Sequence, residues 1–138
     1  MPSRHESRER ALQMLFLWDQ NREAPDKVAA RYWGGLWTEE PAAARPQPDE
    51  FANQLLHGTV SRAEEIDRLI TTHAEHWRLE RMSAVDRNIL RLAAYELLEG
   101  QTPAPVVIDE ALEIARRFSG EEAVQFINGV LDAIRKAL

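Results

Sequence analysis

The chain has 138 residues, of which 29% are charged, and it carries a net charge of −6 at pH 7 and no cysteine. Without cysteine it can form neither a disulfide framework, nor a thiolate metal site, nor a cysteine nucleophile. The acidic balance argues against general coating of nucleic acid but leaves room for a local basic patch. No window approaches the length of a membrane span and the start lacks the apolar core of a signal peptide, so we expect one globular domain in the cytoplasm with no membrane contact.

Apolar residues recur at helical spacing in nearly every segment, and no run alternates apolar and polar residues as a half-buried strand would. The fold is therefore predicted to be all-α. A first helix is expected over residues 7–20. A second is expected over residues 26–37, with Asp26 as its N-cap.

Residues 38–48 hold three prolines and are expected to form a surface loop, because proline interrupts helical hydrogen bonding. We expect this loop to separate two helical subdomains, at about residues 1–37 and 49–138, within a single domain over residues 1–138. A long helical stretch follows the loop over residues 49–76. Gly58 and Ser61 are the points at which it is expected to bend into two helices.

The last third of the chain is expected to hold three helices. The first begins after a Ser83 cap and ends at Gly100, and the second covers residues 106–118 behind two prolines. The third has a narrow apolar stripe with spacings of three and four residues: Val124, Ile127, Leu131, Ile134 and Leu138. Phe126 falls about 120° from the middle of this stripe, so we expect its ring on a flank where a partner docks.

No segment has the pattern of a catalytic or metal site. His73 and His76 are three residues apart, whereas the familiar zinc hydrolase motif needs a spacing of four, so we expect solvated or interfacial rings. Ser61 and Ser119 lack a recognisable histidine partner, and no glycine-rich phosphate loop occurs. Acidic residues gather in the first turns of the helix over residues 106–118, as its dipole favours: Asp109, Glu110 and Glu113.

The aromatic residues divide into two groups. The four tryptophans, Trp18, Trp33, Trp37 and Trp77, are candidates for stacking on unpaired bases. We expect most of them to be buried instead, with Trp18 and Trp33 on inward faces of their helices. Phe16 and Phe126 lie off the centre of their apolar stripes. Each is expected either to make a second packing contact or to offer a stacking surface for an unpaired base.

Four segments in this order resemble the NusB family of bacterial transcription antitermination factors: Arg8–Trp18, Asp86–Leu97, Val107–Ala115 and Phe126–Asp132. The resemblance spans the chain from end to end. It implies an all-α bundle of about seven helices that is not an enzyme and needs no cofactor. It also implies binding to the boxA element of ribosomal RNA leader transcripts together with NusE, a small-subunit ribosomal protein. The pair would support read-through by an RNA polymerase complex that contains NusA and NusG.

The resemblance also implies site residues. Those expected to bind RNA are Arg4, His5, Arg8, Arg10, Gln13, Phe16, Gln125 and Phe126. Those expected to face NusE are Asp86, Arg87 and Phe16. Two residues depart from the family pattern, because Glu6 interrupts the basic start and Gln125 stands where a cation would attract phosphate more strongly. We therefore expect RNA affinity to depend heavily on NusE.

Two other functions fit parts of the pattern. NusB-like domains also begin some ribosomal RNA cytosine methyltransferases, but such enzymes need an α/β cofactor domain, and no glycine-rich turn for one occurs here. The second alternative is a non-catalytic helical scaffold that forms a homodimer through the flank of Phe16 or Phe126.

Overall fold

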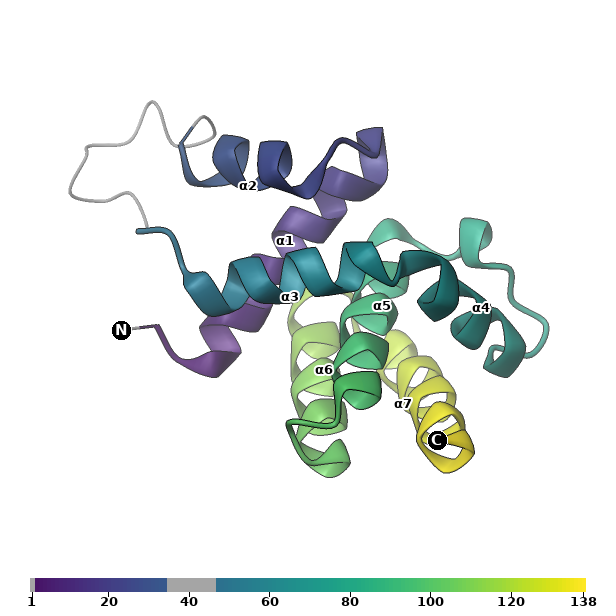
Figure 1. Ribbon diagram of the computed structural model, residues 1–138. Helices are drawn as coiled ribbons and strands as arrows, with labels where there is room; N and C mark the ends of the chain where they lie inside the picture. Colours follow the sequence, from purple (N-terminus) through teal and green to yellow (C-terminus); the bar gives the residue numbers. More distant parts are fainter. Residues whose placement is uncertain (1, 35–46) are drawn as a thin grey trace.

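The computed structural model describes residues 2–34 and 47–138, and helices are the only regular secondary structure in these residues, which confirms the all-α prediction (Figure 1). Within these ranges seven α-helices and one 3-10 helix follow one another: α1 (Arg4–Asn21), α2 (Pro25–Trp33), α3 (Glu50–Ser61), α4 (Ala63–His73), η3 (Leu79–Arg81), α5 (Ala84–Glu99), α6 (Ala104–Phe118) and α7 (Glu121–Ala137). None of the helices in the described ranges is long and apolar enough to cross a membrane.

Three helices begin at a side chain that accepts a hydrogen bond from the backbone N–H three residues further on. Ser3, Asp49 and Ser83 do so for α1, α3 and α5, each at 3.1 Å. Such caps satisfy an N–H group that has no partner within the helix. The predicted Ser83 cap is confirmed, and the Ser3 cap explains why α1 begins three residues before the predicted start at Ser7.

Other helix ends differ from the prediction for local reasons. The prediction of Asp26 as an N-cap is wrong, because Ala24 holds that position and Pro25, with its fixed φ angle, is the first helical residue. Pro103 holds the N-cap position of α6 and Pro105 lies in its first turn, so that helix begins at Ala104 rather than Val106. The predicted end of the second helix and most of the loop over residues 38–48 lie outside the described residues.

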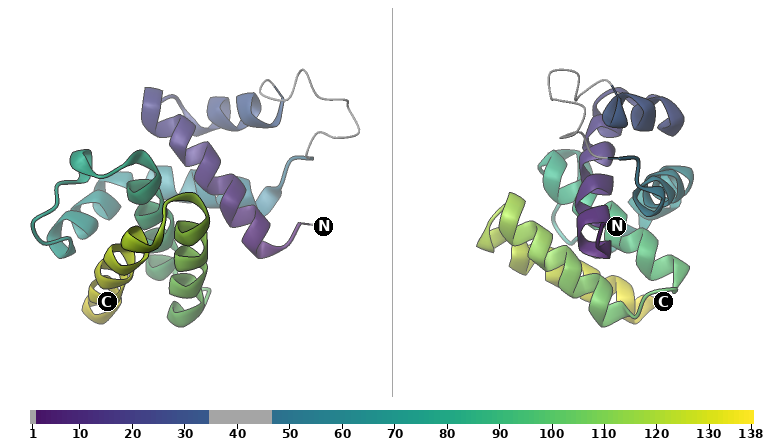
Figure 2. Two further views of the ribbon diagram at one scale, coloured as in Figure 1. Left: turned by 180° about the vertical axis from the view of Figure 1, so that it is seen from behind. Right: turned by 90° about the vertical axis from the view of Figure 1, so that its left-hand side faces the viewer.

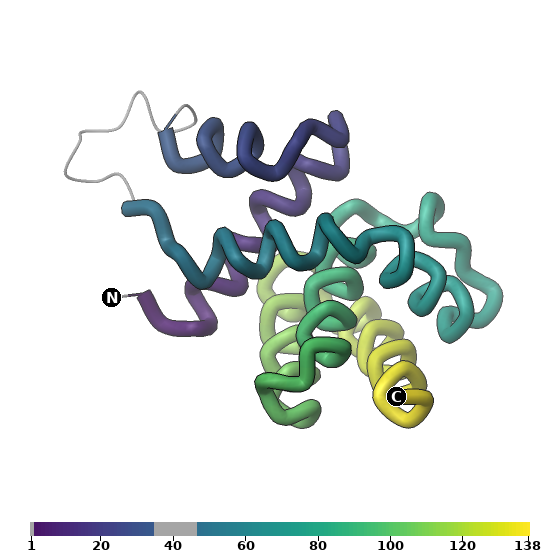
Figure 3. The backbone as a smooth tube through the Cα atoms, in the orientation of Figure 1, coloured from purple at the N-terminus to yellow at the C-terminus, as the bar shows by residue number. Residues whose placement is uncertain are grey.

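The predicted bend in the long helical stretch is confirmed. Helix α3 ends at Ser61, Arg62 leaves helical geometry with φ −111° and ψ 18°, and α4 begins in a new direction (Figure 3). Gly58 matters for another reason. A Cβ atom at this position would lie 2.1 Å from the Tyr95 ring, so the missing side chain lets α3 and α5 approach closely.

Helix α5 lies at the centre of the molecule and contacts α1, α3, α4, α6 and α7. Seen from two further directions, α1 passes between α2 and the layer that α5, α6 and α7 form (Figure 2). Because α1 contacts α2 as well as α3 and α5, it links the start of the chain to the rest. The division into subdomains over residues 1–37 and 49–138 stays a prediction.

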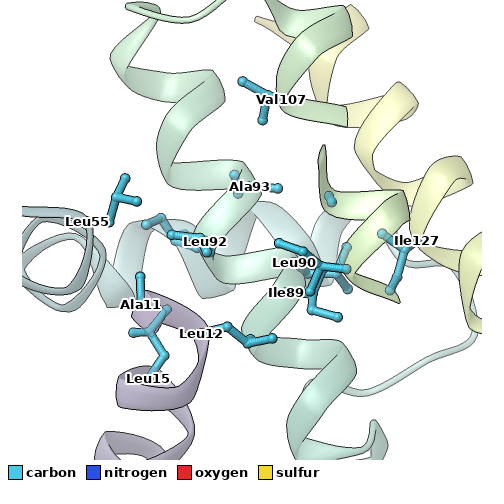
Figure 4. Close-up of a cluster of buried hydrophobic side chains, with 14 of the residues drawn as sticks. Ala11, Leu12, Leu15, Leu55, Ile89, Leu90, Leu92, Ala93, Val107 and Ile127 are labelled. Carbon is cyan, nitrogen blue, oxygen red and sulfur yellow. The ribbon is translucent and has the colours of Figure 1, made fainter. Parts of the chain in front are cut away.

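One apolar core joins these helices (Figure 4). Leu12 and Leu15 of α1 reach it from one side, Ile89 and Leu90 come from α5, and Ile127 comes from α7. The predicted stripe of α7 is buried except at its end, since Leu138 is 60% exposed. Val130, which the stripe omitted, is buried instead.

Buried ion pairs also hold α1 in place. The guanidinium of Arg8 donates two hydrogen bonds of 2.8 Å to the carboxylate of Glu96 on α5. Near the other end of α1, Asp19 accepts from Arg87 at 2.6 Å and lies 3.1 Å from Arg91. Removing one member of such a pair leaves an uncompensated buried charge, so these contacts fix how α1 lies on α5.

Candidate nucleic-acid interface

The basic start of α1 is less accessible than its sequence indicates. Arg4 is exposed, and its guanidinium lies 3.7 Å from the centroid of the Phe51 ring. Arg10 is half-buried, 3.9 Å from Glu6 and 3.7 Å from Asp49. Both Arg10 distances are long for an ion pair, and Arg4 packs against a ring. The guanidinium groups of Arg4 and Arg10 can therefore still meet a phosphate.

Arg8 is different, because it is 5% exposed and its guanidinium is engaged by Glu96. This burial contradicts the expectation that Arg8 contacts RNA phosphates. A cation that faced a phosphate would have to leave a bidentate partner and expose the opposite charge. The sequence could not separate Arg8 from Arg4 or Arg10, because the partner lies 88 residues away.

His5 belongs to a cluster that the sequence analysis did not find. Its Nδ1 lies 2.6 Å from Glu110 Oε2 and its Nε2 lies 2.8 Å from Glu9 Oε1, while Glu113 is 3.8 Å away. Within the described ranges, His5, Glu110 and Glu113 also form the one group with metal-binding composition. Both ring nitrogens already face carboxylate oxygens, however, and only a protonated imidazole donates from both. The cluster is therefore best described as an ion-pair network between α1 and α6.

The hydrogen bond to Glu110 raises the pKa of His5 above its ordinary value, against the effect of burial, with further support from the charges of Glu9 and Glu113. A raised folded-state pKa means that the protonated ring stabilises the fold. That contribution is complete below the unfolded pKa of about 6.5 and disappears as the pH rises through the folded value.

We predict that His5→Gln lowers the free energy of unfolding by less than about 1 kcal/mol near pH 6, since the cluster is partly exposed. The difference from the unaltered protein should shrink at higher pH. Urea unfolding at several pH values measures it, with the exposed His76→Asn as control. A difference that grows with pH would contradict the role of the protonated ring.

His73, one of the two histidines expected within one helix, is the last residue of α4. Its Nδ1 turns toward its own helix, 2.9 Å from the carbonyl oxygen of Leu69. His76 is exposed, beyond the end of the helix, with φ 66°. The two rings therefore belong to different backbone environments.

An apolar groove of about 390 Å³ lies beside Phe16. Its lining comes from four helices: Leu12, Gln13, Phe16, Leu17, Tyr32, Val85 and Phe118. Phe16 is half-buried, and Phe118 is 39% exposed. Gln13 is exposed and its side-chain oxygen accepts a hydrogen bond from the Tyr32 hydroxyl. An open apolar surface of this kind suits side chains of a protein partner.

Asp86 and Arg87 begin α5 next to this groove, because Val85 is one of its lining residues. Asp86 accepts a hydrogen bond of 2.6 Å from the Ser119 hydroxyl. Arg87 turns inward and donates to Asp19 and to the carbonyl oxygen of Met82, at 2.6 and 2.9 Å. Asp86 thus remains near the surface, whereas the guanidinium of Arg87 helps to hold α1 on α5.

On α7, Gln125 is exposed, and Phe126 is partly buried against the core. Phe126 also contacts Trp77, with ring centroids 5.5 Å apart and planes tilted by 58°. Phe126 was expected either to make a second packing contact or to offer a stacking surface. Its ring makes the packing contact and is also part of an aromatic pair at the surface.

Trp77 is one of the four tryptophans considered for base stacking, but it was not among the expected site residues because most tryptophans were expected to be buried. Trp18 and Trp33 are buried, but Trp77 is 54% exposed, and Trp37 lies outside the described residues. Trp77 follows the end of α4 and precedes Arg78 and Arg81, both exposed and without an ion pair to any described residue. The sequence signal for an exposed Trp77 was its place in a connecting segment, next to basic residues.

A hollow of about 480 Å³ lies between this pair of rings and the start of α7. Its lining includes Arg81, the hydroxyl-bearing Ser83 and Ser119, and the acids Asp86, Glu121 and Glu122. Val85 and Phe118 line the apolar groove, and the residues that follow them in sequence, Asp86 and Ser119, line this hollow. The two depressions are therefore neighbours, and together they form one face with an apolar part and a polar, aromatic part.

The chain matches a family model, that of the NusB family, over residues 5–136. It is 54% identical to the transcription antitermination protein NusB of Solibacter usitatus, with 100% of this chain and 92% of that protein covered. It is 52% identical to the protein of the same name from Koribacter versatilis, with 99% and 90% covered.

Solved structures agree with these relatives. T. maritima NusB superposes with a TM-score of 0.81 at 35% identity, over 98% of this chain and 92% of that one. A chain from the crystal structure of antitermination factors NusB and NusE in complex with dsRNA gives a TM-score of 0.80 at 29% identity, over 98% and 97%.

Proposed function

Because the chain belongs to the NusB family, we propose that it is a bacterial transcription antitermination factor that binds boxA RNA of ribosomal RNA leader transcripts together with NusE. The observation that carries this proposal is the continuous face on which an apolar groove adjoins an exposed aromatic pair flanked by Arg78 and Arg81. A protein partner suits the first part of this face, and single-stranded RNA suits the second.

Within the proposal, the residues that the family resemblance implies keep their roles, apart from Arg8. We assign RNA contacts to Arg4, His5, Arg10, Gln13, Phe16, Gln125 and Phe126, and NusE contacts to Phe16, Asp86 and Arg87. Arg8 is left out because it is buried in its pair with Glu96. The factor would act in the cytoplasm without catalysing a reaction, in the RNA polymerase complex that contains NusA and NusG.

The test is fluorescence anisotropy of a labelled boxA RNA against a scrambled control, at two salt concentrations, with and without purified NusE. We expect a preference for boxA that sharpens with NusE, since Glu6 and Gln125 weaken the basic surface of this chain. Absence of preference in both settings would contradict the proposal. Light scattering on the same samples detects any homodimer. A homodimer formed through the apolar groove would compete with NusE for that surface.

Arg4→Ala should weaken binding of boxA and scrambled RNA alike, because a phosphate contact carries no sequence information. The slope of log affinity against log salt should fall by about 0.7, the value for one phosphate contact on a single strand. Arg135→Ala on α7 removes an exposed arginine far along the chain and is the matched control. If both variants change the salt dependence of RNA affinity equally, the change reflects the net charge of the protein and not a contact between Arg4 and a phosphate.

A further inference from the structure

The hollow beside Trp77 has the dimensions of a ligand site. Its volume of about 480 Å³ falls within the range of small-molecule pockets, about 300–1,000 Å³. Two aromatic rings form one wall, and polar groups from η3, α5 and α7 form the others. A double helix would not enter it, whereas a single base turned out of a strand would.

The aromatic wall is suited to stacking. Phe126 is held by the core, and Trp77 rests against it at 5.5 Å while more than half of the Trp77 surface stays exposed. The tilt of 58° between the rings means that they do not cover each other face to face. Trp77 therefore keeps an indole surface for a planar ligand, and every base has a flat face that can stack on it.

The polar wall favours hydrogen-bond donors. Asp86, Glu121 and Glu122 bring three carboxylates against one guanidinium, that of Arg81. Carboxylates repel a phosphate and accept N–H groups. Among the RNA bases, guanine presents two neighbouring donors on its Watson–Crick edge, N1–H and the 2-amino group, which one carboxylate can accept together. The hollow therefore suits a guanine base, while Arg81 in its lining and the exposed Arg78, next to Trp77 in sequence, suit the flanking phosphates.

We propose that this hollow is a pocket for one unpaired guanine of the bound RNA, with Trp77 as the stacking residue and a carboxylate of the pocket as the reader of its Watson–Crick edge. The inference rests on the proposed RNA-binding function and gives the ligand class of one part of that surface. Trp77 then contacts RNA directly, in addition to the residues that the family resemblance implies.

The test uses the complete chain with NusE and a set of short single-stranded RNAs that differ at one position. The position holds guanine, inosine, which lacks the 2-amino group, or 7-deazaguanine, which keeps the Watson–Crick edge. We expect guanine and 7-deazaguanine to bind alike and inosine to bind about 5-fold or more weaker, as for the loss of one good base contact. Bound guanine should also quench tryptophan fluorescence.

Protein variants separate stacking from folding. Trp77→Ala should weaken binding of the guanine RNA by about 5- to 150-fold, the range for one stacked base, and should abolish the quenching. Trp77→Phe keeps a ring and should retain most of the affinity while losing the quenching, and thermal unfolding verifies that both variants fold.

Unchanged boxA binding by Trp77→Ala, or equal binding of guanine and inosine RNAs, would overturn the inference without touching the proposed function. Loss of all RNA binding by the unaltered protein would instead overturn the proposed function. Binding of a lysine-rich peptide that displaces no RNA would assign the acidic hollow to a protein partner and would also overturn the inference.

Discussion

Arg91→Ala should lower the free energy of unfolding by about 3–5 kcal/mol, the usual cost of removing one member of a buried ion pair. Arg91 is 2% exposed. Its guanidinium donates to both carboxylate oxygens of Asp67, at 2.8 and 3.2 Å, and to Asn88 at 2.9 Å, and it lies 3.1 Å from Asp19. The substitution therefore removes the bidentate partner of Asp67 on α4 and one of the cations that face Asp19 on α1.

The electrostatics of Asp19 support this expectation. Burial by itself would raise the pKa of Asp19, but the hydrogen bond from Arg87 and the charge of Arg91 bring that pKa below its ordinary value. The ionised carboxylate thus depends on its cations. Loss of Arg91 should leave Asp19 with Arg87, Asn88 and the more exposed Arg22, and should loosen the contact between the ends of α1 and α5.

Urea unfolding and thermal melting measure the effect, and a melting temperature lower by about 10 °C or more is expected for a domain of this size. Arg135→Ala is the control, because Arg135 is exposed and its surface pair with Asp132 should contribute little to stability. Equal stability of the two variants would show that the buried network contributes little beyond its packing.

The helices were largely predictable because their apolar stripes depend on local spacing. The stripe of α7 and the break after Ser61 follow from residues near one another in sequence. Helix ends depended on smaller effects. Asp26 has the side chain of a good cap, but Pro25 before it already fixes the first helical residue.

The candidate site was predictable only in part, because exposure depends on residues distant in sequence. Arg8 and Arg4 look alike on a helical wheel, yet Glu96 buries one of them and the other stays exposed. His5 meets Glu110 only because α6 packs near the start of α1. Trp77 shows the same limit, since the sequence did not distinguish it from the buried tryptophans and it lies half in solvent.

Phe126→Ala should weaken RNA binding by about 5- to 150-fold, because it removes one aromatic ring and the support on which Trp77 rests. It should also lower the free energy of unfolding by about 1–2 kcal/mol, less than a fully buried phenylalanine would, since Phe126 is only partly packed against the core. Anisotropy with boxA RNA measures the first effect and urea unfolding the second.

Phe126→Leu separates these two roles. Leucine keeps most of the apolar contact with the core and should leave stability within about 1.5 kcal/mol of the unaltered protein. It has no ring, so the loss of RNA affinity should persist and Trp77 should become more mobile in fluorescence anisotropy decay. A leucine variant that binds RNA as well as the unaltered protein would mean that Phe126 serves packing alone. The exposed indole of Trp77 would then provide the aromatic surface without a second ring behind it.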